Sequence, residues 1–104
     1  MKGNLIITVS SREDILDQLR RLKPSLQQEF PLQRLALFGS WARNQQSESS
    51  DVDILVEVDP SIGLRFVTLA ERLEQAVGRR ADVVSRRAIK PSLWIKIEPE
   101  LIDA

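Results

Sequence analysis

Cysteine, histidine and tyrosine are all absent from this chain of 104 residues. Without cysteine the protein forms no disulfide and has no thiolate nucleophile, which fits a reducing compartment. Without histidine it has no imidazole base, no serine–histidine catalytic pair and almost no means of building a zinc site. The titratable groups left for catalysis are carboxylates, lysines and arginines. An enzyme made from these groups would use carboxylates to hold a hard cation such as Mg²⁺.

The chain also lacks a long apolar run and an excess of charge of either sign. No segment reaches the ~18 apolar residues of a membrane span, and residues 1–10 contain no small-residue cleavage site. Fifteen Lys plus Arg balance fifteen Asp plus Glu, so no overall field attracts nucleic acid or an anionic membrane. We therefore expect a cytoplasmic protein that contacts neither, and in which any phosphate chemistry is local.

The length predicts one small domain over residues 1–104, and 42% hydrophobic residues are enough to bury a core. Apolar spacing predicts helices that start near residues 11, 64 and 91, and strands over residues 32–38, 51–58 and 80–85. Residues 4–9 are rich in β-branched side chains and suit an edge strand or an ordered arm. Helices around a small mixed sheet make the predicted class α/β or α+β.

Proline, serine and glycine set the expected helix ends. Pro24 should interrupt the first helix, or open a second short helix that runs through Phe30. We expect Ser61 to cap the helix of residues 64–77 and Gly78 to end that helix. Pro99 should weaken the closing helix, whose apolar pattern runs to residue 101.

Acidic residues open the second predicted strand. Side chains two positions apart on a strand point to the same face, with Cα atoms ~6.6 Å apart, so Asp51 and Asp53 can converge on one site. Asp82, on the third predicted strand, is the best candidate for a third carboxylate. Carboxylates packed this closely repel one another unless a cation is present. The pattern therefore predicts a site for two Mg²⁺ ions.

A glycine-serine turn closes the first predicted strand. Gly39 lets backbone amides approach an anion closely, and the hydroxyl of Ser40 can donate to a phosphate oxygen. Arg43, on the same turn, can add a charge-assisted hydrogen bond to that phosphate. Together with the acids, these groups predict a cradle for a nucleoside triphosphate beside a metal site.

Each piece alone has an ordinary structural interpretation. A D-x-D triplet is most often a solvated strand face, and Arg43 alone would be a surface charge. Asp82 alone would be a surface acid paired with Arg79 or Arg80. The order of the pieces favours a site, because the turn ends one strand and the acids begin the next.

The segments F-G-S-x-x-A-R, S-D-x-D and A-D-V-V, with ten residues between Gly-Ser and D-x-D, resemble the minimal nucleotidyltransferases of the DNA polymerase beta superfamily. The resemblance covers roughly residues 11–102 and implies a nucleotidyltransferase core. Members of this family are typically antitoxins encoded beside a HEPN-domain ribonuclease toxin. Some of them transfer AMP from ATP to a tyrosine of that toxin and so silence it.

Carried onto this chain, the resemblance implies two sets of site residues. The nucleotide-binding set is Gly39, Ser40, Arg43 and Ser50, and the metal-binding and catalytic set is Asp51, Asp53 and Asp82. Asn44 stands where the family commonly has glycine, and asparagine tolerates a left-handed turn. The implied protein is a Mg²⁺-dependent adenylyltransferase in a hetero-oligomer with its toxin.

Three alternatives stay open at this point. The protein could be an antitoxin that neutralises its toxin by binding alone, or a nucleotidyltransferase that modifies a small molecule. It could also be a generic small domain whose acids merely begin a strand.

Overall fold

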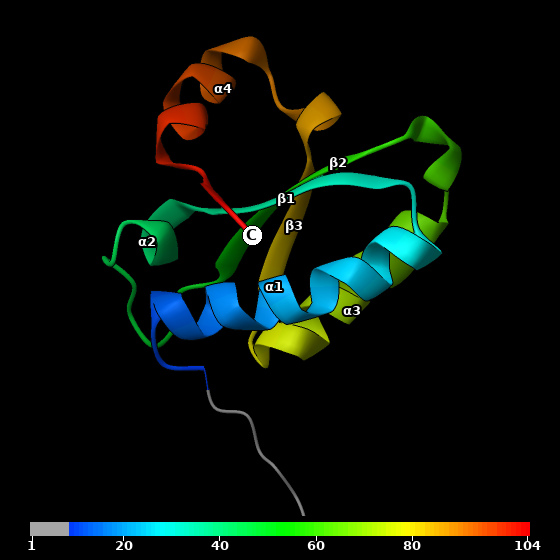
Figure 1. Ribbon diagram of the computed structural model, residues 1–104. Coiled ribbons are helices and arrows are strands. Elements are labelled where there is room, and N and C mark those ends of the chain that lie inside the picture. The colour runs from blue at the N-terminus through cyan, green and yellow to red at the C-terminus, as the bar shows by residue number, and fades with distance from the viewer. Residues whose placement is uncertain (1–8) are drawn as a thin grey trace, which may run out of the picture.

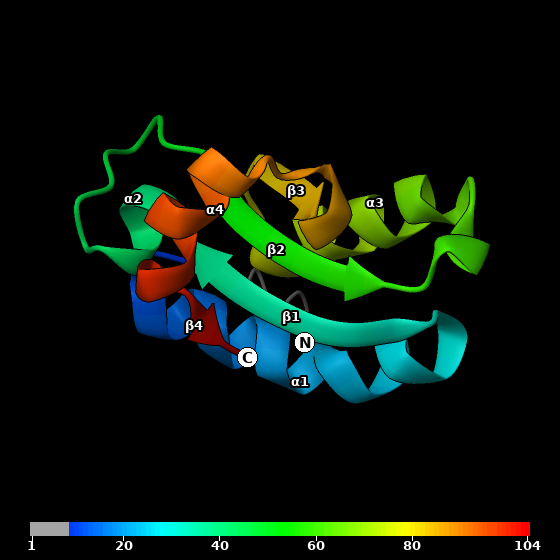
Figure 2. The ribbon, with the colours of Figure 1, turned by 90° about the horizontal axis from the view of Figure 1, so that it is seen from above.

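The computed structural model describes residues 9–104 and contains a mixed sheet of four strands in the order β3-β2-β1-β4 (Figure 1). β1 (Leu32–Phe38) lies antiparallel to β2 (Val52–Val58) on one side and to the short β4 (Ile102–Asp103) on the other. β2 lies parallel to β3 (Ala81–Ser85). Figure 2 shows β4 beside β1 at the sheet edge. The α+β class and the small mixed sheet are confirmed, whereas the strand or arm expected over residues 4–9 lies almost wholly outside the described residues.

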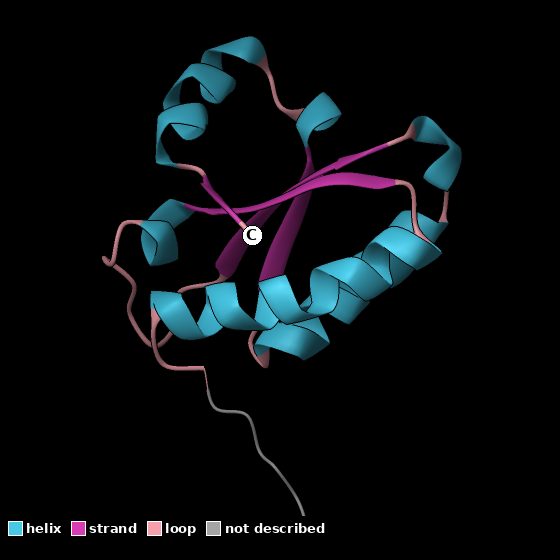
Figure 3. Ribbon diagram, viewed as in Figure 1, coloured by secondary structure: helices cyan, strands magenta, loops and turns pink. Residues whose placement is uncertain are grey.

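Helices cover both faces of this sheet (Figure 3). α1 (Arg12–Glu29) and α3 (Arg65–Val77) lie together below it in Figure 1, and α4 (Pro91–Ile97) lies above it. The four-residue α2 (Gly39–Ala42) follows directly on β1. Single 3-10 turns occupy Pro60–Ile62, Arg86–Ala88 and Glu98–Glu100. Within residues 9–104, no helix is both long and apolar enough to cross a membrane.

Each face of the sheet has its own apolar cluster, and β2 contributes to both. Val52, Ile54 and Val56 are buried in the larger cluster, which contains the apolar residues of α1 and α3. Leu55 is buried in the smaller cluster with Ile97 at the end of α4. The side chains of β2 therefore alternate between the two faces, which places Asp53, two residues before Leu55, on the α4 face.

α1 begins as predicted but does not stop where predicted. The hydroxyl of Ser11 caps it by accepting a hydrogen bond from the Asp14 amide at 3.1 Å. The expected interruption at Pro24 is wrong, because the helix continues to Glu29. Leu19 and Leu26 are fully buried on either side of the exposed Pro24. Burial along the same helix face offsets the backbone hydrogen bond that proline cannot donate.

The start of α3 and the end of the chain also differ from expectation. Ser61 does not cap α3. Its amide donates to the Asp59 carboxylate at 2.9 Å and so begins a separate 3-10 turn. Gly78 does end α3, in the left-handed conformation predicted for it. The closing helix stops at Ile97, two residues before Pro99, and the chain then forms β4 instead of continuing as a helix.

We expect Pro24→Ala to stabilise the protein, because alanine restores an amide donor inside a helix that already continues past this position. Thermal or urea unfolding should show a gain of about 1–3 kcal/mol in the free energy of unfolding. Ser25→Ala, at the neighbouring exposed position, is the matched control and should change it by about 0.5 kcal/mol or less. A loss of stability in Pro24→Ala would mean that α1 depends on a break at the proline.

Candidate active site

The junction of β1 and α2, at Gly39, packs directly against an acidic side chain. β1 and β2 are antiparallel, so the end of β1 meets the start of β2, and Phe38 pairs with Asp53. Gly39 has a φ of +77°, a conformation that side chains other than glycine rarely adopt. A Cβ atom added at Gly39 would overlap the carboxylate of Asp53. Glycine is therefore required here both by the backbone conformation and by the close approach of Asp53.

Three acids gather at this end of the sheet. Asp53 pairs with Asp82 across the parallel β2–β3 ladder, and Asp51 lies two residues before Asp53, at the entry to β2. Asp51 and Asp82 are exposed, whereas Asp53 is half-buried. Burial, followed by repulsion from Asp82 and then from Asp51, raises the pKa of Asp53 to about 6. The structure thus brings the three predicted acids together and concentrates negative charge there.

These acids do not already form a metal-binding geometry. In the part of the chain that the structure describes, no three acidic side chains are already arranged as a metal-binding group. Repulsion from both Asp82 and Asp51 nevertheless reaches Asp53, so a cation placed among them would lower the electrostatic cost of all three. Oxygen donors of this kind suit Mg²⁺.

The other predicted residues lie around the same turn. Ser40 is the second residue of α2 and is half-buried. Arg43 ends α2, and its guanidinium group lies near enough to Asp53 to oppose the rise in that residue's pKa. Asn44 follows with a φ of +57°, which is the left-handed turn that the sequence led us to expect.

Ser50 and Asp82 have surroundings that the sequence did not specify. The Ser50 hydroxyl accepts a hydrogen bond from the Ser47 amide at 2.9 Å, and its carbonyl accepts one from the Trp41 indole at 3.3 Å. Ser50 therefore ties the 44–50 loop to α2. Arg79, a possible partner of Asp82, instead donates to the Val9 carbonyl at 2.9 Å and stacks on Trp41.

Glu100 is a site residue that the sequence analysis missed. Its Oε1 atom accepts a hydrogen bond from the Gly39 amide at 3.0 Å, and its Oε2 atom lies 3.0 Å from Nη1 of Arg43. Glu100 belongs to the 3-10 turn just before β4, a strand of only two residues that leaves no recognisable pattern in the sequence. Without that strand there was no signal to bring Glu100 near the turn.

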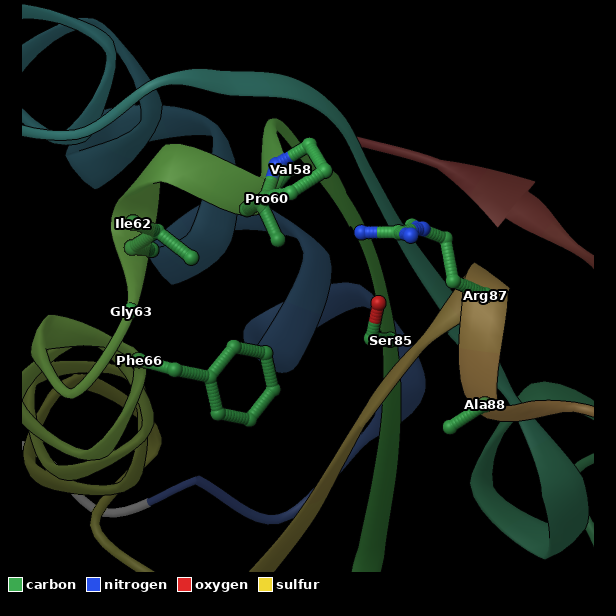
Figure 4. A pocket seen from close by; sticks show the side chains of 8 residues that line it. All are labelled: Val58, Pro60, Ile62, Gly63, Phe66, Ser85, Arg87 and Ala88. Carbon is green, nitrogen blue, oxygen red and sulfur yellow. The ribbon is translucent and has the colours of Figure 1, made fainter.

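A pocket of about 390 Å³ lies at the opposite end of β2 and β3. Val58 and Ser85, the last residues of those strands, line it together with Phe66 and Arg87 (Figure 4). Phe66 points into the pocket in this view, and Arg87 lies on the opposite side of the pocket from Phe66. None of the acids lines this pocket, so the acidic site and the pocket are separate features of the sheet.

Comparison with known proteins identifies the family of the chain. Residues 19–103 match the family described as nucleotidyltransferase domain. The chain belongs to the nucleotidyltransferase domain family. This nucleotidyltransferase is thus an enzyme, and the acids and the Gly39 turn lie within the matched region.

Individual relatives agree with this assignment. The protein adenylyltransferase MntA of Thermococcus cleftensis is 37% identical over 92 residues, which are 86% of this chain and 92% of the relative. A solved structure described as a minimal nucleotidyltransferase superposes with a TM-score of 0.77 at 29% identity, covering 89% of this chain and 95% of the other. A crystal structure of a toxin-antitoxin with AMP-PNP superposes with a TM-score of 0.59 at 26% identity, covering 90% and 72%.

We expect Gly39→Ala to destabilise this nucleotidyltransferase by about 2–4 kcal/mol, because alanine meets both backbone strain and the Asp53 carboxylate. Combining it with Asp53→Ala should reduce the cost, leaving the backbone strain of about 1–2 kcal/mol and a residual contact with the Cβ of residue 53 at 3.1 Å. Gly63→Ala is the matched control, since Gly63 has a φ of +54° but its added Cβ would make only an ordinary contact, 3.9 Å from the Ser61 carbonyl oxygen. Equal costs for Gly39→Ala and Gly63→Ala in urea unfolding would contradict the close approach of Asp53.

The raised pKa of Asp53 predicts an unusual pH dependence for the metal-free protein. The folded state binds the Asp53 proton more tightly than the unfolded state, whose pKa is near 3.9, so folding should gain stability as pH falls through about 6. Urea unfolding with a chelator should show this gain in the wild type between pH 7 and pH 5. Asp53→Asn should remove the pH-dependent part and be more stable than the wild type at pH 7. Parallel pH profiles for the two proteins would rule out the raised pKa.

Proposed function

We propose that this nucleotidyltransferase transfers AMP from ATP to a tyrosine of a HEPN-class ribonuclease toxin and thereby neutralises it. The observation that carries the proposal is the packing of Asp53 against the Gly39 turn, with Asp51 and Asp82 beside it. The printed name of the Thermococcus relative, a protein adenylyltransferase, supports the reaction. The toxin-antitoxin neighbour with AMP-PNP supports a toxin partner and an adenine nucleotide.

Asp51, Asp53 and Asp82 are the residues that would hold Mg²⁺, in two ions by analogy with the family. Bound there, Mg²⁺ would neutralise the charge of a triphosphate and of the transition state. Ser40, Arg43 and Ser50 are the side chains proposed to bind ATP. Gly39 has no side chain and is proposed to let the triphosphate approach the backbone closely, while its own amide donates to Glu100. Arg43 suits the phosphates because a guanidinium group donates charge-assisted hydrogen bonds to them.

The reaction follows from placing ATP between the turn and the acids. The tyrosine oxygen attacks the α-phosphorus, a new P–O bond forms, and the bond from the α-phosphorus to the bridging oxygen breaks. Pyrophosphate leaves with the electron pair of that bond. Asp82 lies exposed beside Asp53 and is the group proposed to accept the tyrosine proton. Because the chain contains no tyrosine, the acceptor tyrosine belongs to another polypeptide.

The partner surface is proposed to lie on the late helices, separate from the acids. Leu93 and Ile95 of α4 are 49% and 72% exposed. Large exposed apolar side chains of this kind suit a protein interface. The working assembly would then be a cytoplasmic hetero-oligomer of this chain and its toxin.

Labelled ATP tests the reaction directly. Incubated with Mg²⁺ and the toxin encoded beside it, the wild type should transfer label from α-labelled ATP to the toxin and none from γ-labelled ATP, because pyrophosphate leaves. Asp51→Asn and Asp53→Asn should each reduce transfer by about 100-fold or more. Asp17→Asn, which removes an exposed acid of α1 that pairs with Arg21, is the matched control and should transfer normally.

Three outcomes would contradict the proposal. Label from the γ position would indicate a kinase. Full transfer by Asp53→Asn would remove the acids from the reaction. Neutralisation of the toxin without any label on it would leave an antitoxin that acts by binding alone.

A further inference from the structure

We infer that Glu100 is a positioning residue for the triphosphate site, one that holds the guanidinium group of Arg43 and the Gly39 turn in the geometry that ATP requires. This inference rests on the proposed function, because it assigns Arg43 to the phosphates. It adds a residue from the C-terminal segment to a site otherwise built from β1, α2 and the starts of β2 and β3.

The backbone places Glu100 opposite Gly39. β1 and β4 are antiparallel, and Leu37 pairs with Ile102, so continuing the register by two residues sets Gly39 against Glu100. The Ala104 amide donates to the Leu35 carbonyl at 2.9 Å, so the backbone N–H and C=O groups of Leu35 point toward β4. These groups change sides from one residue to the next, so those of Leu37 and Gly39 point the same way as those of Leu35. The Gly39 amide therefore faces β4 and not β2. Where the ladder ends, the Glu100 side chain replaces a backbone carbonyl as the acceptor, at 3.0 Å.

The same carboxylate fixes Arg43. Nη1 of Arg43 lies 3.2 Å and 3.0 Å from the two carboxylate oxygens of Glu100, and Nε donates to the amide oxygen of Gln45 at 3.1 Å. Two of the three guanidinium nitrogens are thus held, one by the 3-10 turn before β4 and one by the loop after α2. Within the described residues the third, Nη2, makes no hydrogen bond, so its two N–H groups are available to a phosphate.

The exposed fractions of Glu100 and Arg43 agree with the proposed role of Glu100 in positioning Arg43. The Glu100 side chain is 24% exposed and that of Arg43 45% exposed, so the carboxylate is the better-anchored partner and the guanidinium group the more accessible one. A flexible arginine would lose more side-chain entropy when it bound a phosphate.

A competing view makes Glu100 an internal anion that blocks the phosphate site and leaves when ATP binds. The direction of the Gly39 amide argues against it, because that amide faces the β4 edge and continues the ladder. The two views predict opposite effects of removing the charge of Glu100: positioning predicts weaker ATP binding, and blocking predicts tighter binding.

Calorimetry with ATP and Mg²⁺ on the full chain distinguishes them. Glu100→Gln keeps an oxygen acceptor for the Gly39 amide but loses the charge that holds Arg43, and it should weaken ATP binding about five- to tenfold. Glu100→Ala, which also removes that acceptor, should weaken it further. Glu98→Gln is the matched control, an exposed glutamate of the same 3-10 turn, and should bind ATP like the wild type.

A double-mutant cycle separates positioning from a general loss of stability. In an Arg43→Ala background, Glu100→Gln should cause no further loss of ATP affinity, because the group that it positions is gone. Equal losses in both backgrounds, or tighter binding by Glu100→Gln, would overturn the inference.

NMR of the Arg43 side chain tests the contact without nucleotide. The Nε–H relaxation of Arg43 should report a rigid group in the wild type and in Glu98→Gln, and a mobile one in Glu100→Gln. A mobile Arg43 in the wild type would overturn the inference. A wild type in which Arg43 is rigid through Glu100 but no ATP binds would instead overturn the proposed function, so the two failures are distinguishable.

Discussion

The close packing of the Asp53 carboxylate on Gly39 is the constraint on which the rest of the site depends. It exists because β1 and β2 are antiparallel neighbours, so that the end of one strand meets the start of the other. The parallel pairing of β2 with β3 then adds Asp82 beside Asp53. β4, on the other side of β1, brings Glu100 to the same turn. One sheet topology therefore collects a backbone turn, a basic group and four acids at a single end of the molecule.

This arrangement of acids costs the metal-free protein stability, and a bound cation would relieve that cost. Burial and two like-charged neighbours raise the pKa of Asp53 to about 6, so the metal-free protein disfavours the ionised form that a metal ligand needs. Strongly perturbed carboxylates of this kind are typical of functional sites. Burial of the apolar clusters on both faces of the sheet stabilises the fold and offsets this electrostatic cost. The metal-free protein therefore carries an electrostatic cost at the place where it is proposed to bind Mg²⁺ and ATP.

Most of the fold and the gathering of the three acids at one end of the sheet could be predicted from the sequence, because both depend on local patterns. The apolar spacing of residues 51–58 predicted a strand close to the observed Val52–Val58, and the two-residue spacing of Asp51 and Asp53 predicted that these side chains share a face. The course of α1 through Pro24 could not be predicted, because burial of residues on the sheet outweighs the local cost of proline. Glu100 could not be predicted either. It reaches the site through two residues of β4, a strand too short to leave an alternating pattern, and its partner Gly39 is 61 positions away.

A crystal structure of the protein with AMP-PNP and Mn²⁺, with anomalous scattering to locate the metal, tests the central claim most directly. The account predicts a triphosphate against Gly39 and Ser40, with anomalous peaks beside Asp51 and Asp53. The pocket at the far end of the sheet, lined by Phe66 and Arg87, is the alternative nucleotide-binding site within the same molecule. A nucleotide bound in that pocket, with no metal among the acids, would contradict the assignment of the acidic end as the active site.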